Sequence, residues 1–388
     1  MRIALYGGSF NPPHLGHAEA AKTVVSALAP DRFLIVPANI PPHKALADDS
    51  PSAAQRLELC RLAFAEIPQS EISEIELRRE GKSYTYDTVV QLREEYPEDE
   101  FFLVIGTDML MSFEEWYHFR YLLENCTLAV LARAEEDGEP LREKAAALRD
   151  EYGAHVVLLP HEPIEASSEK IRERLPLRAG EDLLCDAVYS EIIRRRYYGA
   201  KPALTWLREK TLDYLDEHRV AHVAGCENEA VRLAQRWGED PELAAEAAIL
   251  HDITKRLSYD QQLQYCEKYG IINDNSELRN KSLLHAKTGA ALARELFGVE
   301  DAVYEAIRWH TTGKPDMTRF EKILYLADYI EPTRDFEGID ELRSLAYEDL
   351  DAAMALGLKM TIGEIRRAGR EVFIDTLNAF EWYNEKEK

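Results

Sequence analysis

Cysteine is scarce and scattered in this chain of 388 residues. The five cysteines are Cys60, Cys126, Cys185, Cys226 and Cys266, and no two of them form the Cys-x-x-Cys spacing that is typical of zinc sites and redox motifs. We therefore predict reduced thiols in the protein interior rather than disulfides or metal ligands.

Long apolar runs are also absent. No stretch approaches the roughly 20 apolar residues that cross a bilayer as a helix, and the chain opens on a strand-like segment rather than on a basic and apolar leader. The sequence therefore predicts a cytoplasmic protein that has no membrane partner.

Basic residues are too few for a nucleic-acid surface. The chain carries 47 Lys and Arg against 71 Asp and Glu, which gives a formal net charge of -24. Nucleic acids favour a basic protein face, so we predict no nucleic-acid partner, although a local basic pocket for phosphates remains compatible with this charge. No internal repeat relates the two halves, and the oligomeric state stays open, so the sequence allows a homo-oligomer.

The length of the chain favours two domains over one. The segment 192–199 has the pattern of a helix end with a glycine stop, and the segment 200–202 ends in a proline before a new helix begins at Leu204. Strand patterns occur before this point and are replaced by long apolar-periodic helices after it. We predict a first domain over 1–199, a linker over 200–202 and an all-α second domain over 203–388.

The first half alternates short apolar runs with amphipathic segments. Strands are expected at 2–6, 32–37, 72–77, 101–105, 126–132 and 155–159, and helices at 17–28, 52–65 and 86–95. This alternation is typical of a doubly wound α/β fold with a parallel sheet, whose ligands bind beyond the carboxyl ends of the strands.

The stretch GGSFNPPHLGH, Gly7 to His17, joins the first expected strand to the first helix. Gly7 and Gly8 let the backbone turn tightly and approach a ligand, and a helix N-terminus favours a phosphate. His14 and His17 are three residues apart, so both imidazoles can donate to phosphate oxygens from one side of the helix. A structural zinc site is the weaker alternative, because no further ligands lie nearby.

This stretch resembles the His-x-Gly-His signature of the nucleotidylyltransferase superfamily, and the full string is similar to nicotinate mononucleotide adenylyltransferases in particular. The resemblance covers about the first half of the chain. It implies a Rossmann-like domain that transfers the adenylyl group of ATP to nicotinate mononucleotide, with Mg²⁺ bound together with ATP. Nicotinamide mononucleotide or a pantetheine phosphate is the alternative acceptor.

The same resemblance implies site residues, carried over where the motifs match. The catalytic residues would be His14, His17, Lys44 and Arg172. The residues that bind ATP would be Gly7, Gly8, Ser9, Phe10, His17, Gly106, Asp108, Ser167, Ser168 and Arg172. The residues that bind nicotinate mononucleotide would be Lys44, Tyr84, Thr85, Trp116 and Arg133. Ala166 and Glu169 depart from the Ile and Thr of the family pattern, so Glu169 is left out.

The helical half contains histidines and aspartates in an order that favours a metal site: His222, His251, Asp252, His285, His310 and Asp328. Imidazole and carboxylate are suitable ligands for iron, manganese or zinc, and an aspartate can bridge two ions. A single histidine of this kind is more often a core residue, but the whole set in order makes a metal site the better interpretation.

That order resembles the HD-domain phosphohydrolases, and the surrounding segments are similar to the bacterial branch that hydrolyses diadenosine tetraphosphate to two ADP. The resemblance implies two metal ions bridged by Asp252, with iron expected and manganese also allowed. It also implies catalytic roles for Asp252 and Lys255 and polyphosphate contacts from Arg219, Lys255, Thr333 and Arg334. A guanosine tetraphosphate hydrolase and a non-catalytic nucleotide sensor that regulates the first domain are the alternatives.

Overall fold

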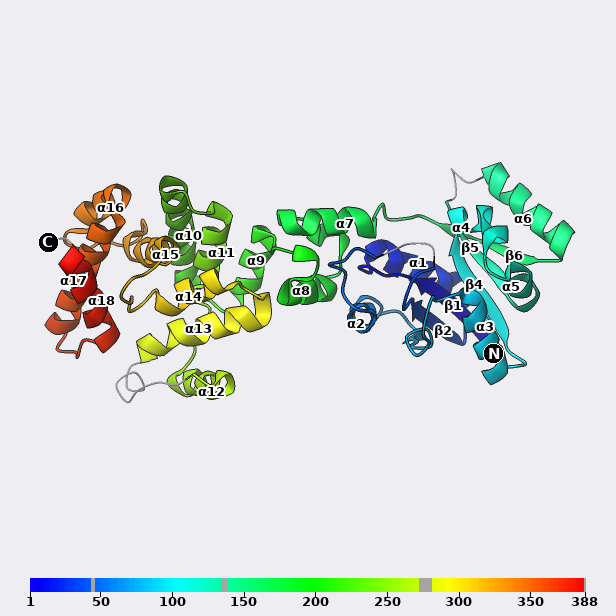
Figure 1. The fold of residues 1–388 in the computed structure, drawn as a ribbon, viewed down its shortest axis with the longest axis horizontal. Helices are drawn as coiled ribbons and strands as arrows, with labels where there is room; N and C mark the ends of the chain where they lie inside the picture. Colours follow the sequence, from blue (N-terminus) through cyan, green and yellow to red (C-terminus); the bar gives the residue numbers. More distant parts are fainter. Residues whose placement is uncertain (43–45, 134–137, 272–280, 387–388) are drawn as a thin grey trace. The chain divides into compact units, whose positions relative to one another are not determined.

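The computed structural model describes residues 1–42, 46–133, 138–271 and 281–386. The predicted site residue Lys44 therefore lies outside the described residues. The chain divides into two compact units, Met1–Lys201 and Pro202–Lys388 (Figure 1). All five cysteines are free, and four of them are buried.

The first unit is built on a six-stranded sheet in the order β3-β2-β1-β4-β5-β6. Its strands are β1 (Arg2–Gly8), β2 (Arg32–Pro37), β3 (Ser70–Ile72), β4 (Glu100–Gly106), β5 (Thr127–Arg133) and β6 (His155–His161). Every neighbouring pair is parallel. The strand order reverses direction between β1 and β4, and this is the point where doubly wound folds bind ligands at the carboxyl edge.

Helices cover both faces of this sheet (Figure 1). They are α1 (Leu15–Leu28), α2 (Ala53–Ala63), α3 (Thr85–Glu95), α4 (Thr107–Met111), α5 (Phe119–Asn125), α6 (Gly138–Tyr152), α7 (Ser168–Arg174) and α8 (Asp186–Arg195), with short 3₁₀ turns at Phe113–Glu115, Leu175–Leu177, Glu181–Leu183 and Tyr197–Gly199. Alternate residues of β1 supply two separate cores: Ile3 and Leu5 pack with α3 and α6 side chains, and Ala4 packs with those of α1 and α2. The predicted doubly wound α/β fold is confirmed.

One predicted strand is wrong in its extent. The expected strand over 72–77 is β3, which ends at Ile72, and the chain leaves the sheet after the Ser73 N–H has bonded to the Ile35 carbonyl at 2.8 Å. Ile75 and Glu76 are consecutive and both buried, whereas a strand would send them to opposite faces. The Glu76 carboxylate instead accepts the Thr88 hydroxyl of α3 at 2.8 Å, so this segment folds as turns.

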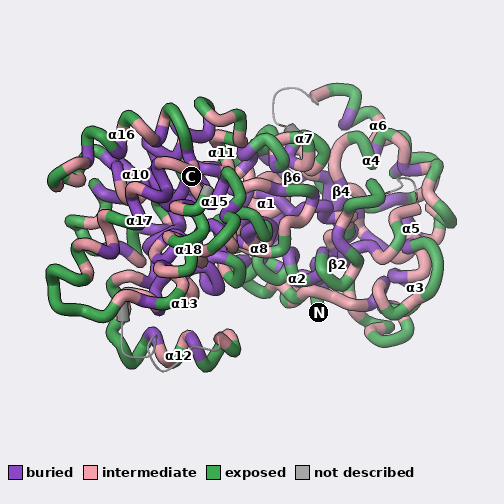
Figure 2. Tube along the Cα trace, turned by 60° about the vertical axis from the view of Figure 1, so that its left-hand side comes forward, coloured by how far each residue is buried: buried purple, intermediate pink, exposed green. Residues whose placement is uncertain are grey.

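The second unit is helical throughout its described residues. Its helices are α9 (Leu204–Leu212), α10 (Glu217–Trp237), α11 (Pro241–Leu250), α12 (Tyr259–Tyr269), α13 (Lys281–Phe297), α14 (Asp301–Trp309), α15 (Arg319–Ile330), α16 (Ile339–Glu348), α17 (Leu350–Arg367) and α18 (Ile374–Lys386). The run Ala244–Leu250 is buried on every side, which makes α11 the central helix, and α10 packs against α11 and α15 (Figure 2). The prediction of an all-α second half is confirmed, and within the described chain no helix has the length and apolarity to span a membrane.

A buried arginine joins α2 to the loop that follows β1. The Arg56 side chain is fully buried. Its guanidinium donates to the carbonyls of Ser9, Ala38 and Asn39, with Nη2 lying 2.7 Å from the Ala38 oxygen. Because these carbonyls belong to the ends of β1 and β2, Arg56 fixes the carboxyl edge of the sheet.

We expect Arg56→Leu to lower the free energy of unfolding of the first unit by about 3 kcal/mol or more, because each buried carbonyl left without a donor costs about 1–3 kcal/mol. The measurement is native-state hydrogen exchange of the β1 amides over a urea series. Arg61→Leu on the same helix is the control, since Arg61 forms exposed ion pairs with Glu58 and Glu74, worth below about 1 kcal/mol. Equal effects of the two substitutions would contradict the bracing role of Arg56.

Candidate active sites

The loop after β1 makes its tight turn at Phe10, which has a φ of 44°. The glycines before it are in the extended backbone of β1 and not, as expected, at the turn itself. An added Cβ on Gly8 would lie 3.0–3.2 Å from atoms of the Phe10 ring. A side chain at position 8 would therefore press on the Phe10 ring, which folds back over the strand end.

The two histidine rings of the loop lie against each other, tilted by 31°, at the start of α1. His14 is the N-cap of α1, and the ring centroids of His14 and His17 lie 3.7 Å apart. The backbone N–H of His14 donates to Nδ1 of His17 at 3.2 Å. Since Nδ1 of His17 accepts this bond, its neutral ring carries the proton on Nε2, where it can be donated to a ligand.

Burial keeps both imidazoles neutral. Burial lowers the pKa of His14 to about 4. Burial is the main cause that lowers the pKa of His17 well below its usual value, and the nearby His14 lowers this pKa further. At neutral pH the two rings are therefore uncharged hydrogen-bond donors, and a bound anion would favour their protonation.

Side chains from distant parts of the unit fasten the loop. The Ser168 hydroxyl donates to the Pro12 carbonyl at 2.8 Å, and Arg172 Nη1 donates to the Asn11 carbonyl at 2.6 Å. The Tyr198 hydroxyl donates to Asn11 Oδ1 at 2.8 Å. The predicted residues of α7 thus lie at the glycine and histidine loop, with Ser167 as the N-cap of α7.

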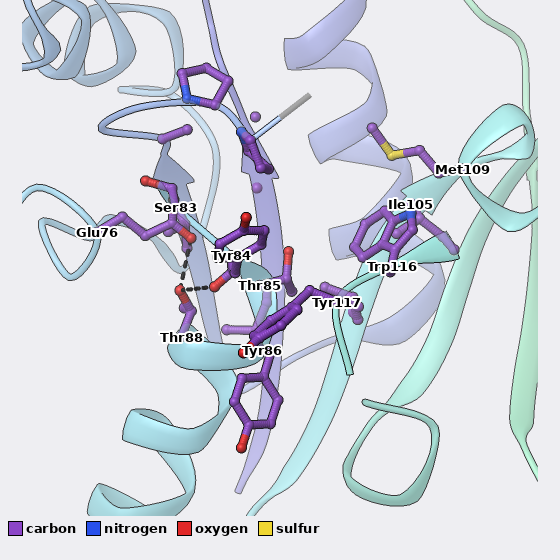
Figure 3. A pocket seen from close by; sticks show the side chains of 18 of the residues that line it. Glu76, Ser83, Tyr84, Thr85, Tyr86, Thr88, Ile105, Met109, Trp116 and Tyr117 are labelled. Atoms are coloured by element: carbon purple, nitrogen blue, oxygen red, sulfur yellow. Dashed lines mark hydrogen bonds between the residues drawn. The ribbon is translucent and has the colours of Figure 1, made fainter. Parts of the chain in front are cut away.

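A pocket opens at the carboxyl edge of the sheet (Figure 3). Its lining brings together predicted residues that are far apart in the sequence: Gly7, Gly8, Ser9, Tyr84, Thr85 and Trp116. Trp116 is half-buried and stacks on Phe113 with ring centroids 5.0 Å apart. Gly106 ends β4 beside the lining residue Ile105, and the exposed Asp108 follows on α4. Arg133 ends β5 at this edge, and its side chain is not among those described.

The same pocket contains residues that sequence reasoning missed. Tyr117 is 49% exposed, and its ring centroid lies 4.7 Å from that of Tyr84 (Figure 3). Its position next to Trp116 was the only available signal. Glu76 is buried in the lining, and burial raises the pKa of its carboxyl. Nothing in the sequence marks Glu76, because it comes from a turn that was expected to be a strand.

The second unit gathers the predicted metal ligands into one cluster, in which all members are buried except the partly exposed Asp328. They come from α10 (His222), the C-terminal end of α11 (His251 and Asp252), α13 (His285), the C-terminal end of α14 (His310) and α15 (Asp328). Two triads have their ligand atoms within 4.8 Å of one another: His222, His251 and Asp328, and His251, Asp252 and His310.

Asp252 lies between two groups of imidazoles. Its Oδ2 atom is 3.7 Å from His222 Nε2 and 3.6 Å from His251 Nε2. Its Oδ1 atom is 3.2 Å from His285 Nε2 and 3.7 Å from His310 Nε2. Asp328 Oδ1 lies on the first side, 3.1 Å from His222 Nε2. One carboxylate therefore presents a separate oxygen to each group.

These residues fit a divalent metal ion. His222 Nε2, His251 Nε2 and Asp252 Oδ1 are buried atoms that have no hydrogen-bond partner among the described residues. Nδ1 of His251 and Nδ1 of His310 each lie 2.6 Å from a main-chain carbonyl oxygen, so each Nε2 presents its lone pair to the centre of the cluster.

The electrostatics of the cluster also suit a metal. Burial lowers the pKa of His251 and of His285 to about 4, so both rings are neutral ligands. Burial opposes ionisation of Asp252 and Asp328, but the surrounding histidines hold the pKa of both carboxyls well below the usual value. Neutral imidazoles and ionised carboxylates are the protonation states that bind metal.

Three partly exposed cations surround the cluster. Arg219 Nη1 is 2.5 Å from Asp252 Oδ2, Lys255 Nζ is 3.0 Å from His285 Nε2, and Arg334 Nη2 is 2.9 Å from Asp328 Oδ1. These are predicted polyphosphate contacts, and the structure places them beside the cluster. The fourth, Thr333, directs both its N–H and its hydroxyl to Glu331.

Sequence reasoning missed Glu331 itself. This residue is fully buried, and its Oε1 lies 3.0 Å from His222 Nδ1. The available signal was a carboxylate three residues after Asp328 and directly before Pro332.

Each of the two units matches a known protein family. The cytidylyltransferase-like family model matches residues 5–174, and the HD domain model matches residues 219–333.

Relatives of each half are separate proteins. The chain is 40% identical over 169 residues to a symmetrical bis(5'-nucleosyl)-tetraphosphatase of Bacillus subtilis, covering 43% of this chain and 90% of that protein. It is 34% identical over 203 residues to a probable nicotinate-nucleotide adenylyltransferase of Fusobacterium nucleatum, covering 51% of this chain and 99% of that protein. A crystal structure of a predicted HD superfamily hydrolase involved in NAD metabolism from Clostridium acetobutylicum is 36% identical, covers 47% of this chain and 97% of that chain, and has a TM-score of 0.46.

We expect His14 and His17 to make the start of α1 less stable in acid. The pKa of an unfolded histidine is about 6.5, and the folded values are lower, about 4 for His14. The unfolded chain therefore binds more protons between pH 6.5 and 4, and the free energy of unfolding falls as the pH decreases through this window. Hydrogen exchange of the α1 amides at pH 7 and pH 5, corrected for intrinsic rates, measures the change.

His14→Gln should reduce the difference between the two pH values, because glutamine does not titrate. His155→Gln serves as the control, since His155 is exposed at the start of β6. An unchanged pH difference in His14→Gln would contradict the assignment.

Proposed function

We propose that this chain is a bifunctional enzyme with one activity in each half. Its first half belongs to the family of the nicotinate-nucleotide adenylyltransferases, and its second half belongs to the family of the symmetrical bis(5'-nucleosyl)-tetraphosphatases. The adenylyltransferase domain is residues 1–199, the linker is 200–202 and the hydrolase domain is 203–388. Two compact units that divide at Lys201 support this arrangement.

The first activity is transfer of the adenylyl group of ATP to nicotinate mononucleotide. A phosphate oxygen of the mononucleotide forms a bond to the α-phosphorus of ATP, the bond from that phosphorus to the bridging oxygen breaks, and pyrophosphate leaves. The attacking phosphate already carries its negative charge, so no general base is needed. The protein has to align the groups and stabilise charge on the α-phosphoryl oxygens.

One observation carries this assignment: the pocket joins the Gly7–Ser9 strand end to Tyr84, Thr85 and Trp116. The neutral His14 and His17 rings donate to phosphate oxygens at the start of α1, where the helix dipole also favours an anion. Trp116, supported by Phe113, offers an aromatic face for the nicotinate ring. Arg172 braces the loop through Asn11 and uses its remaining donors on the ATP phosphates.

The second activity is hydrolysis of diadenosine tetraphosphate between its two central phosphates. Water adds to one central phosphorus, the bridging oxygen leaves with the other half, and two ADP result. The separate contacts of the two Asp252 oxygens support a site for two divalent ions, iron or manganese. Ions held there would polarise the water and neutralise phosphate charge. Arg219, Lys255 and Arg334 would hold the polyphosphate chain.

We expect the purified, metal-loaded chain to convert diadenosine tetraphosphate to two ADP, and Asp252→Ala to lose both bound metal and hydrolysis. Removing Asp252 deletes an oxygen ligand from each group of histidines. Chromatography identifies the nucleotide products, and elemental analysis counts the metal.

Asp260→Ala, at an exposed position of α12, is the control and should retain both properties. Products of AMP and ATP would contradict the symmetric cut. Hydrolysis of guanosine tetraphosphate but not of diadenosine tetraphosphate would identify the second half as a guanosine tetraphosphate hydrolase. Bound metal without hydrolysis of either compound would favour a non-catalytic nucleotide sensor.

We expect His17→Ala to lower the adenylyl-transfer rate by about 10²–10³-fold while ATP still binds, because its Nε2 donor stabilises charge that develops during the reaction. Turnover with nicotinate mononucleotide and the Kd of ATP separate these effects. Replacing the exposed His155 by alanine should change neither quantity. Near-normal turnover of His17→Ala would mean that the loop binds substrate without stabilising the transition state.

Competition between the acid and amide mononucleotides tests the acceptor. Preference for the acid supports the proposed substrate, and preference for the amide contradicts it.

A further inference from the structure

We infer that Glu331 is a positioning residue that orients the His222 imidazole toward the metal centre. We also infer that glycine at position 225 leaves the space that the Glu331 carboxylate occupies. This inference rests on the proposed metal site and adds to it two residues that do not touch metal or substrate. Glu331 follows the last residue of α15, the helix that carries Asp328, whereas His222 and Gly225 lie on α10.

The contact fixes which nitrogen of His222 faces the cluster. His222 Nδ1 lies 3.0 Å from Glu331 Oε1, while Nε2 lies 3.1 Å from Asp328 Oδ1 and 3.7 Å from Asp252 Oδ2. Although burial opposes it, Asp328 and Glu331 raise the pKa of His222. A metal ion would therefore take the place of the Nε2 proton, while the Nδ1 proton stays donated to Glu331. A carboxylate in this place also increases the basicity of the ligating nitrogen.

Glu331 must accept hydrogen bonds at both of its oxygens. The Thr333 N–H donates to Oε2 at 2.7 Å, and the Thr333 hydroxyl donates to Oε1, which also faces His222. An amide has only one acceptor oxygen, so glutamine would place its NH₂ group against a donor. The site is therefore built for a carboxylate.

Gly225 provides the space for this carboxylate. It lies nearly one helical turn after His222, and a Cβ added there would collide with Glu331 Oε2. Glycine inside a helix costs about 1 kcal/mol relative to alanine. Gly225 therefore makes α10 less stable as a helix, but it allows the Glu331 carboxylate at the end of α15 to lie against α10.

His222 differs in this respect from two other histidines of the cluster. His251 and His310 are oriented by main-chain carbonyls of their own helices. His222 depends on a side chain from another helix, which ties α10 to α15 at the side of the cluster formed by His222, His251 and Asp328. Loss of Glu331 should therefore weaken metal binding on this side and spare the side of His285 and His310.

The test is a metal titration of the full chain. Wild type and the variants Glu331→Gln and Gly225→Ala are stripped with a chelator and titrated with Mn²⁺, and free Mn²⁺ is counted by electron paramagnetic resonance. We expect one class of bound Mn²⁺ to weaken about 10–100-fold in both variants, with the other class unchanged. Gly363→Ala is the matched control, because a Cβ added there on α17 meets no atom within 4 Å.

A cobalt spectrum separates positioning from a loss of fold. The ligand-field bands of Co²⁺ at saturating metal should shift in Glu331→Gln, whereas a protein that is only less stable would give the wild-type bands. A third single variant, Glu331→Ala, tests whether Gly225 acts through Glu331. If it does, the double variant Gly225→Ala/Glu331→Ala should bind Mn²⁺ as tightly as Glu331→Ala alone. Additive losses would overturn the role of Gly225, and unchanged affinity in both Glu331→Gln and Gly225→Ala would overturn the inference. A wild-type chain that binds no Mn²⁺ would instead overturn the proposed metal site.

Discussion

Buried polar atoms must find a partner, and this requirement shapes both halves of the protein. In the first unit the carbonyls of the loop after β1 are satisfied by buried or partly buried side chains: Arg56, Ser168 and Arg172. These bonds tie the loop to α2 and α7. In the second unit His222 Nε2, His251 Nε2 and Asp252 Oδ1 are left without hydrogen-bond partners among the described residues. An unsatisfied cluster of this kind is unfavourable by itself and suited to a metal ion.

Burial also explains how neutral imidazoles serve two different chemistries. Desolvation lowers the pKa of His14 and of His251 to about 4. The His17 ring, whose Nδ1 accepts a backbone bond, can donate from Nε2 to phosphate. The His251 ring, whose Nδ1 faces a carbonyl, can offer the Nε2 lone pair to a metal. The partner of Nδ1 therefore decides whether a buried histidine acts as a donor or as a ligand.

The second unit sets three cations beside the aspartates of its cluster, within a chain that is acidic as a whole. The net charge of -24 argues against extended polyanions. Arg219, Lys255 and Arg334 nonetheless lie around the aspartates of the second unit. Their ion pairs with the aspartates hold these cations in place, and a small polyphosphate could be bound there without a basic surface.

The sequence by itself determined the fold class of each half, because strand and helix periodicities are local properties of the chain. It also indicated the loop histidines and the metal-ligand set, since His14 and His17, and His251 and Asp252, lie within short motifs. Only the tertiary structure decided what supports them. Arg56 and Ser9 are 47 residues apart, Tyr198 and Asn11 are 187 apart, and Glu331 and His222 are 109 apart. The buried Glu76 carboxylate likewise finds a partner in Thr88 of α3, 12 residues further along the chain. No local pattern encodes such pairs, because a buried side chain acquires its partner only when distant segments pack together.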